Sequence, residues 1–206
     1  MPMIGFYNYT VWLTYLSLVS SVVGIGLAHG GKLTAAVFCL LFSGFCDLFD
    51  GKVARTKKDR TDEEKRFGIQ IDSLCDIVCF GALPAAISFA LSNSVWQTVI
   101  ACAFVLCGLI RLAYFNVTEE TRQQQTSEVR KYYLGLPITL SALFVPLLWV
   151  FRSVIGNAFP VAYSILLLLL AFFYICPIKI KKPGKAGTIV LIAAGAVILV
   201  LGIVLN

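Results

Sequence analysis

Long apolar runs recur along the whole chain, and they constrain its fold more than any other feature of the sequence. Several approach or exceed the ~18 apolar residues that mark a membrane-spanning helix. Of the 206 residues, 59% are hydrophobic and only 14% are charged, which excludes an ordinary soluble domain. We therefore expect an all-α polytopic membrane protein whose residues 1–206 form a single integral-membrane domain. Seven spans are predicted, at residues 11–29, 33–54, 69–92, 95–117, 134–151, 160–177 and 186–205.

The basic residues predict how these spans are oriented. They gather on one side of the predicted membrane, around residues 52–66, 122–131 and 179–185, whereas the other side holds only Lys32 and Arg152. By the positive-inside rule, we expect a cytosolic N-terminus and a C-terminus outside. The net charge of +6 is largely this asymmetry and suits an anionic lipid surface, so we expect a bilayer and no nucleic acid as partner. No basic leader or cleavage site precedes the first run, so no cleaved signal peptide is expected.

Four aspartates lie inside or at the edge of two neighbouring predicted spans. Asp47 and Asp50 are three residues apart, and Asp72 and Asp76 are four apart, so each pair shares one helix face. A carboxylate at membrane depth is costly unless it is paired, hydrated or bound to a cation. Oxygen ligands favour Mg²⁺ or Mn²⁺, and two such ions can clamp a phosphoryl group. The pattern therefore predicts a site for divalent metals toward the cytosolic ends of both helices.

Small residues and one arginine accompany the aspartates. Gly51 would let a ligand approach the helix backbone, and Ala54 and Gly68 keep bulk away one turn from an aspartate. Arg55 supplies a planar donor fork that matches phosphate oxygens. Together they predict a metal-bound diphosphate held between two helices. A cation transporter, a neutralising set of intramembrane acids and a structural scaffold are the alternatives, and none of them explains the glycines and the arginine as well.

At these residues the sequence resembles the CDP-alcohol phosphatidyltransferases. Their signature, Asp-x-x-Asp-Gly-x-x-Ala-Arg, a spacer and Gly-x-x-x-Asp-x-x-x-Asp, is matched at every fixed position. The resemblance implies a six-helix core, here with a seventh C-terminal span at 186–205, and a homodimer. Residues 56–67 separate the two halves of the motif, and these twelve residues stand where about eight are usual. The segment is charged, so we expect a solvated loop there. Loops tolerate changes of length, so the longer spacer is compatible with the family.

The resemblance also implies a reaction, in which an alcohol displaces CMP from a CDP-activated lipid. Asp76 would be the catalytic base that accepts the proton of the alcohol. The positioned base would contribute roughly 10²–10⁴-fold to the rate. Metal binding, to two Mg²⁺ or Mn²⁺ ions, is assigned to Asp47, Asp50, Asp72 and Asp76, and CDP binding to Asp47, Gly51, Ala54, Arg55 and Gly68.

Flanking segments indicate which alcohol is the acceptor. Residues 67–81, 111–116 and 135–138 are similar to the phosphatidylserine synthase branch of the family. That similarity implies CDP-diacylglycerol and L-serine as substrates and phosphatidylserine and CMP as products. Two positions depart from the branch: Cys79 stands where serine is commoner, and Tyr114 where a second arginine often occurs.

Arg111 and Asn116 are the candidate acceptor-binding residues. Arg111 lies late in an apolar run, where a guanidinium requires a carboxylate or phosphate partner unless it extends to the membrane interface. We interpret it as an anchor for serine or for a lipid phosphate, with Asn116 as a further polar contact. Glycerol 3-phosphate or an inositol phosphate is the alternative acceptor, and a phosphorylated acceptor would favour more basic residues than Arg111 alone.

Overall fold

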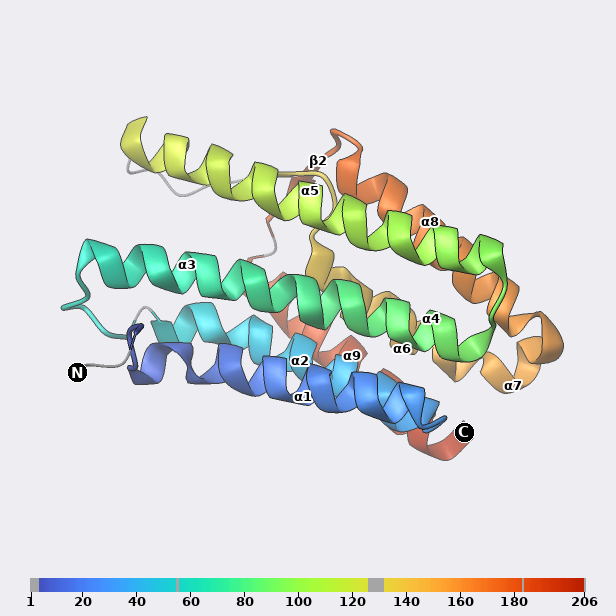
Figure 1. The fold of residues 1–206 in the computed structure, drawn as a ribbon. Coiled ribbons are helices and arrows are strands. Elements are labelled where there is room, and N and C mark those ends of the chain that lie inside the picture. The colour runs from blue at the N-terminus through green and yellow to red at the C-terminus, as the bar shows by residue number, and fades with distance from the viewer. Residues whose placement is uncertain (1–3, 55, 126–131, 183, 206) are drawn as a thin grey trace.

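The computed structural model describes residues 4–54, 56–125, 132–182 and 184–205, and helices account for most of them (Figure 1). Two short helical turns belong to the first half of the chain: the 3-10 turn η1 leads into α1, and the π-helical turn η2 joins α3 to α4. The elements of this half are η1 (Tyr9–Val11), α1 (Trp12–His29), α2 (Leu33–Ala54), α3 (Asp62–Asp76), η2 (Ile77–Ala82), α4 (Leu83–Leu91) and α5 (Val95–Gln125).

In the second half of the chain, the strands of a small antiparallel ribbon precede η3 and follow α8, and α9 comes after the second strand. The strands β1 and β2 pair in the register Tyr132 with Lys181 and Leu134 with Lys179. The elements of this half are β1 (Tyr132–Leu134), η3 (Ile138–Leu140), α6 (Ser141–Val150), α7 (Arg152–Ile155), η4 (Gly156–Ala158), α8 (Phe159–Ile175), β2 (Lys179–Lys181) and α9 (Lys185–Leu205).

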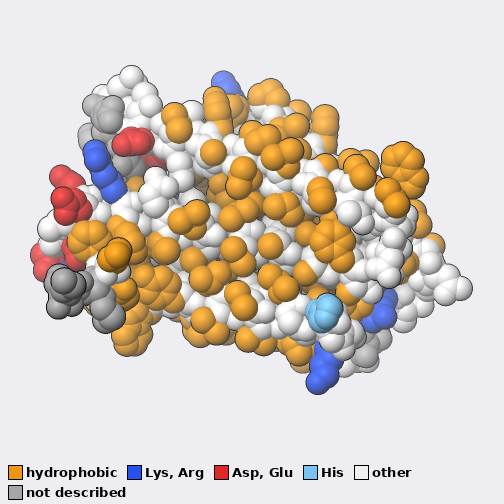
Figure 2. Space-filling view, in the orientation of Figure 1, with side chains coloured by type: hydrophobic (Ala, Val, Ile, Leu, Met, Phe, Trp, Pro, Cys, Tyr) orange, Lys and Arg blue, Asp and Glu red, His pale blue; other side chains and the backbone are white. Residues whose placement is uncertain are grey.

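The predicted all-α multi-pass membrane fold is confirmed. Six helices in the described part are long and apolar enough to cross a membrane, and the shorter apolar helix Ile138–Val150 corresponds to the predicted span 134–151. Large apolar side chains are exposed along the sides of the helices, among them Leu109, Phe172 and Val197. Figure 2 shows this apolar surface over the middle of the molecule, with charged side chains toward its ends. An apolar surface of this extent is typical of contact with lipid.

The expectation of a solvated loop over residues 56–67 is wrong for its second half. Residues 62–67 form the first turns of α3, which therefore begins at Asp62 and not near residue 69. The reason is local, because Thr61 and Glu64 form a capping box in which each side chain binds the backbone N–H of the other residue. Only residues 56–61 of the described part connect α2 to α3, and we call this end of the bundle the α2–α3 end.

Hydroxyl groups hold α1 close to α2 along their buried faces. The Ser43 hydroxyl donates to the backbone oxygen of Ser17 at 3.0 Å, and the hydroxyls of Ser21 and Ser43 are 2.8 Å apart. A Cβ on Gly24 would lie 2.9 Å from Cβ of Cys39, so only glycine permits this approach. Small residues and hydrogen bonds between helices replace the hydrophobic effect inside a membrane. The pairing fixes the part of α2 that carries Asp47, one turn beyond Ser43.

Candidate functional site

The last turns of α2 and the second half of α3 bring three of the predicted metal ligands together. One carboxylate oxygen from each of Asp47, Asp50 and Asp72 lies within 4.8 Å of the others, and all three residues are half-buried. Asp76 follows one turn later on α3, and its carboxyl group is adjacent to that of Asp47. The two predicted pairs therefore meet between α2 and α3.

Neighbouring elements hold these aspartates in place. The Thr14 hydroxyl on α1 donates to Oδ2 of Asp50 at 3.4 Å. The Ser17 hydroxyl on the same helix is 3.4 Å from Sγ of Cys79, which lies in the π-helical turn η2 directly after Asp76. Such turns are rare and are frequently found at functional sites. Helix α1 thus contacts both sides of the carboxylate group, and sequence reasoning did not identify Thr14 because a threonine in an apolar helix has no distinctive pattern.

The carboxylate group has the chemistry of a divalent-cation site. Ionised carboxylates 4.8 Å apart repel each other by roughly 3 to 4 kcal/mol per pair at an effective dielectric constant of about 20. A cation removes this repulsion, and an all-oxygen donor set suits Mg²⁺ or Mn²⁺. Ligand oxygens around one Mg²⁺ are about 3 Å apart when adjacent and about 4.2 Å apart when opposite, so these oxygens are near the spacing that a shared ion requires. The described residues therefore fit a divalent ion.

The small residues of the motif lie at the α2–α3 end of the same site. Gly51 and Ala54 are in the last turn of α2, and Gly68 stands one turn before Asp72 on α3. A Cβ on Gly68 would lie 3.7 Å from Nη1 of Arg60, so the Arg60 side chain covers this glycine. Arg55 lies outside the described residues.

The two candidate acceptor residues lie on α5. Arg111 is only 9% exposed, and its positive charge acts on the carboxylate of Asp47. Its guanidinium is 5.1 Å from the ring centroid of Phe115. The Asn116 amide donates from Nδ2 to the Ser73 hydroxyl at 2.9 Å, which joins α5 to α3 beside Asp72. Arg111 and Asn116 therefore border the carboxylate group.

Tyr114, which stands where the resembling branch often has arginine, faces away from the carboxylates. Its side chain is 54% exposed on the outer surface of α5, whereas Arg111 in the preceding turn is buried. The two residues are one helical turn apart, and only Arg111 is buried in the bundle. Tyr114 therefore contributes no buried group beside the carboxylates.

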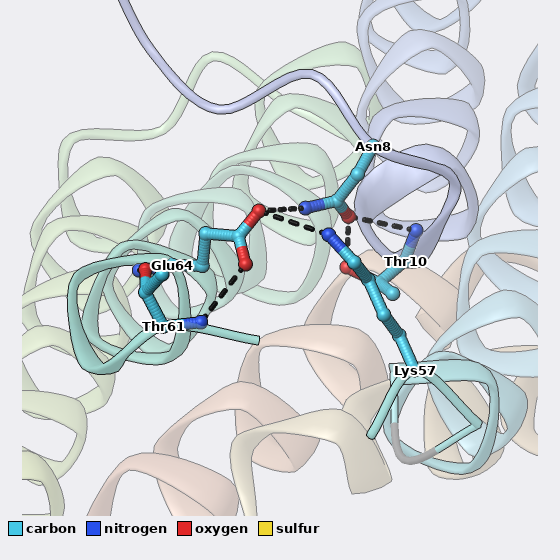
Figure 3. Close-up of polar contacts among 5 residues, drawn as sticks. All are labelled: Asn8, Thr10, Lys57, Thr61 and Glu64. Carbon is cyan, nitrogen blue, oxygen red and sulfur yellow. Dashed lines mark hydrogen bonds and ion pairs between the residues drawn. The ribbon is translucent and has the colours of Figure 1, made fainter. Parts of the chain in front are cut away.

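The connection between α2 and α3 is held by a network of charged and polar side chains (Figure 3). The Glu64 carboxylate accepts hydrogen bonds from Nδ2 of Asn8 at 3.2 Å, Nζ of Lys57 at 3.0 Å and the backbone N–H of Thr61 at 3.0 Å. The Asn8 side chain in turn accepts a hydrogen bond from the backbone N–H of Thr10. Only the capping box was visible in the sequence, as the pattern Thr61-x-x-Glu64.

An apolar cavity of about 320 Å³ opens beside Asp47 and lies between α2, α6 and α9. Among the described residues that line it, Asp47 is the one that is ionisable, and the rest are almost entirely aliphatic or aromatic. The volume is at the lower end of the range for small-molecule sites. Sequence reasoning did not find this cavity, because it depends on how α9 packs against α2. Its lining includes Phe38, Leu41, Phe45, Leu143, Gly195 and Leu199.

Comparison with known proteins yields one family model and several relatives. The model of the CDP-alcohol phosphatidyltransferase family matches residues 7–176, which leaves α9 outside the match. A CDP-diacylglycerol–serine O-phosphatidyltransferase of Saccharomyces cerevisiae is 41% identical over 114 residues, which are 54% of this chain and 39% of that protein. A protein of the same name from Helicobacter pylori is 29% identical over 150 residues, 71% of this chain and 59% of the relative.

A third relative carries a different name. The archaetidylserine synthase of Methanothermobacter thermautotrophicus is 33% identical over 161 residues, which are 76% of this chain and 65% of that protein. The chain thus spans less than two thirds of the length of each of these three relatives. The match to the family model covers both halves of the aspartate motif and the acceptor candidates on α5.

Metal binding to the carboxylate group should be visible as thermal stabilisation. Mn²⁺ or Mg²⁺ added to EDTA-treated protein in detergent should raise Tm, because a ligand at a hundred times its Kd stabilises by about 2.7 kcal/mol. Asp72→Asn should abolish most of this rise, and it should also raise the metal-free Tm because it removes a repelling charge. The control Asp62→Asn alters a carboxylate that is 91% exposed at the start of α3 and should respond to metal like the wild type. A full metal response in Asp72→Asn would contradict the site.

Proposed function

The chain belongs to the CDP-alcohol phosphatidyltransferase family, and from this premise we propose that it transfers a phosphatidyl group from CDP-diacylglycerol to L-serine and releases CMP. The observation that carries the proposal is the group of carboxylates from Asp47, Asp50 and Asp72, beside the glycines of the family motif. The names of the relatives from yeast and Helicobacter pylori support serine as the acceptor.

In this proposal Asp47, Asp50 and Asp72 hold two divalent cations, Mg²⁺ or Mn²⁺, together with Asp76. The bound cations would neutralise the charge of the CDP diphosphate and hold it in place. Gly51, Ala54, Arg55 and Gly68 shape the pocket for the nucleotide, since small residues let it approach both helices.

Asp76 is the proposed base. It would accept the proton of the serine hydroxyl while the serine oxygen attacks the lipid-side phosphorus of the donor. A bond forms between that oxygen and phosphorus, the bond from phosphorus to the bridging oxygen breaks, and the electron pair stays on CMP. The adjacency of Asp76 to Asp47 supports this role, because the base would then lie beside the metal-bound diphosphate. A positioned base contributes roughly 10²–10⁴-fold to such a reaction.

Arg111 is the proposed anchor for the serine carboxylate. A buried guanidinium makes charge-assisted hydrogen bonds to a carboxylate, which orient the small acceptor. Its burial on α5 and its interaction with Asp47 support this assignment. Asn116 would complete the acceptor site through its hydrogen bond to Ser73, which sets the distance between α5 and α3.

The donor's hydrocarbon chain is proposed to enter the cavity between α2, α6 and α9. The cavity begins at Asp47 and is otherwise apolar, so a lipid held by its diphosphate at the carboxylates could extend one chain into it. Bilayer chains are as apolar as the cavity wall, so transfer of a chain from the bilayer into the cavity would add little to the affinity for the donor. The contact would instead orient the donor. The seventh span would in this way become part of the catalytic domain.

The proposed setting is a homodimer in a membrane, with the whole chain acting as one domain. Basic side chains such as Lys57, Lys65 and Arg122 cluster at the α2–α3 end, which supports a cytosolic position of this end and of the N-terminus. Serine and CMP are water-soluble and the donor is a lipid. An active site at the cytosolic membrane face would give all of them access.

The function is tested by CMP release from purified protein. With CDP-diacylglycerol and Mn²⁺, we expect CMP to form when L-serine is added and to stay at background with glycerol 3-phosphate, an inositol phosphate or no acceptor. An ether-linked CDP-lipid in parallel tests the donor chemistry. Serine-independent release, or release with another acceptor alone, would contradict the proposal. Metal-dependent cation uptake into vesicles without CMP formation would favour a transporter.

Asp76→Asn should lower kcat by about 10²-fold or more, because the isosteric amide cannot accept the serine proton. The thermal stabilisation by Mn²⁺ should largely persist, since Asp47, Asp50 and Asp72 remain. The control Asp59→Asn changes an exposed carboxylate in the α2–α3 connection and should retain wild-type kcat. Near-normal turnover in Asp76→Asn, measured in a single-turnover assay, would exclude this residue as the base.

Gly195→Phe should obstruct the cavity, because a side chain at this position extends from α9 past Leu41. We expect kcat/KM for long-chain CDP-diacylglycerol to fall about tenfold, because a displaced chain misplaces the diphosphate at the carboxylates, and a short-chain donor to be affected less. Val197→Phe adds a similar ring on the lipid-facing side of α9, where Val197 is 57% exposed, and should have little effect. Equal losses for both donors would contradict the chain-binding role.

A further inference from the structure

Arg60 is a cationic side chain of the α2–α3 connection that the family motif does not include. It is half-buried, and its Nε atom is buried without a hydrogen-bond partner. In the described part of the chain no carboxylate forms an ion pair with it. Buried polar groups are nearly always hydrogen-bonded, and burial of a charged group is costly without a partner. The environment of Arg60 therefore favours an anionic ligand.

The backbone on both sides of Arg60 is fixed by the network of Figure 3. Lys57 and Thr61 both donate to the Glu64 carboxylate, so the chain is held three residues before Arg60 and directly after it. Thr56 is tied to Tyr9 by a hydrogen bond of 3.0 Å between their hydroxyls. A guanidinium on a fixed loop loses less freedom when it binds a ligand than one on a mobile loop.

The position of Arg60 relative to the carboxylates suggests what it binds. Gly68, Asp72 and Asp76 are spaced four residues apart on α3, so they follow one another along the same face at steps of about 6 Å. The Arg60 guanidinium covers Gly68 at one end of this row, and the proposed base lies at the other. A diphosphate centred on Asp72, with its transferable phosphorus toward Asp76, would direct its nucleotide phosphate toward Arg60.

We propose that Arg60 binds the nucleotide phosphate of the donor, and the same phosphate in the product CMP. This inference rests on the proposed function. When the bond between the lipid phosphorus and the bridging oxygen breaks, the electron pair stays on that oxygen and the CMP phosphate gains negative charge. The parallel N–H donors of a guanidinium match two phosphate oxygens and stabilise this charge. Arg60 would thus hold the donor in register and stabilise the leaving group.

The test compares Arg60→Ala and Arg60→Lys with Lys58→Ala, which removes an exposed cation from the same connection. CMP binding is measured by calorimetry with Mn²⁺ and without turnover. We expect Arg60→Ala to raise the Kd of CMP and the KM of CDP-diacylglycerol about tenfold or more, as the loss of a charge-assisted hydrogen bond requires. The KM of serine should stay within twofold of the wild-type value. The rise in Tm with Mn²⁺ should be unchanged. Arg60→Lys should fall between, because it keeps the charge and loses the planar fork.

Several results would overturn the proposal. One is an Arg60→Ala variant whose CMP affinity equals that of Lys58→Ala, and another is a rise in the KM of serine without a change for CMP. If Arg60→Ala does not fold, the CMP affinity of Arg60→Lys is the test. A wild-type affinity in that variant would exclude Arg60 from binding the nucleotide phosphate. Failure of the proposed function can be distinguished from failure of this inference. If the wild type binds CMP through Arg60 but forms no product with serine, the role of Arg60 stands and serine is rejected as the acceptor.

Discussion

The structure depends on a small group of carboxylates held close together in an apolar helical bundle. Asp47, Asp50 and Asp72 place oxygens within 4.8 Å of one another, and their mutual repulsion favours separation of α2 from α3. Helix α1 opposes this separation because it is joined to both sides, to Asp50 on α2 through Thr14 and to Cys79, in the turn after α3, through Ser17. The bundle thus maintains a concentration of negative charge that a cation stabilises, and the surrounding features follow from this constraint.

Three kinds of surface converge on the carboxylate group. The α2–α3 connection contributes a fixed cation at Arg60, α5 contributes the buried Arg111, and the cavity between α2, α6 and α9 contributes an apolar wall. A ligand that contacts all three surfaces would have a diphosphate and a hydrocarbon chain, and an anionic or polar partner would bind beside it. A CDP-activated lipid and an amino-acid acceptor together have these properties, whereas a bare cation has none beyond its charge. The convergence therefore favours group transfer over ion transport.

Much of the fold and part of the site could be predicted from the sequence, and the failures have physical causes. The apolar runs predicted the spans because burial in lipid requires long helices, and the spacing of the aspartates predicted shared helix faces. Residues 62–67 were misassigned because their charge suggested solvent, although the capping box of Thr61 and Glu64 starts a helix there. Thr14, Arg60 and the cavity were missed because each depends on contacts between segments that are distant in sequence.

Periodicity along one helix is a local property, so the sequence by itself determined a polytopic helical membrane protein with two pairs of carboxylates, each on one helix face. The distance between the pairs is a property of how α1, α2 and α3 pack, and only the tertiary structure decided that three carboxylates meet within 4.8 Å. Packing also decided that Arg60 covers Gly68 and that α9 closes an apolar cavity beside Asp47. Contacts of this kind depend on helix crossing and loop conformation, which the pattern of residue types does not encode locally.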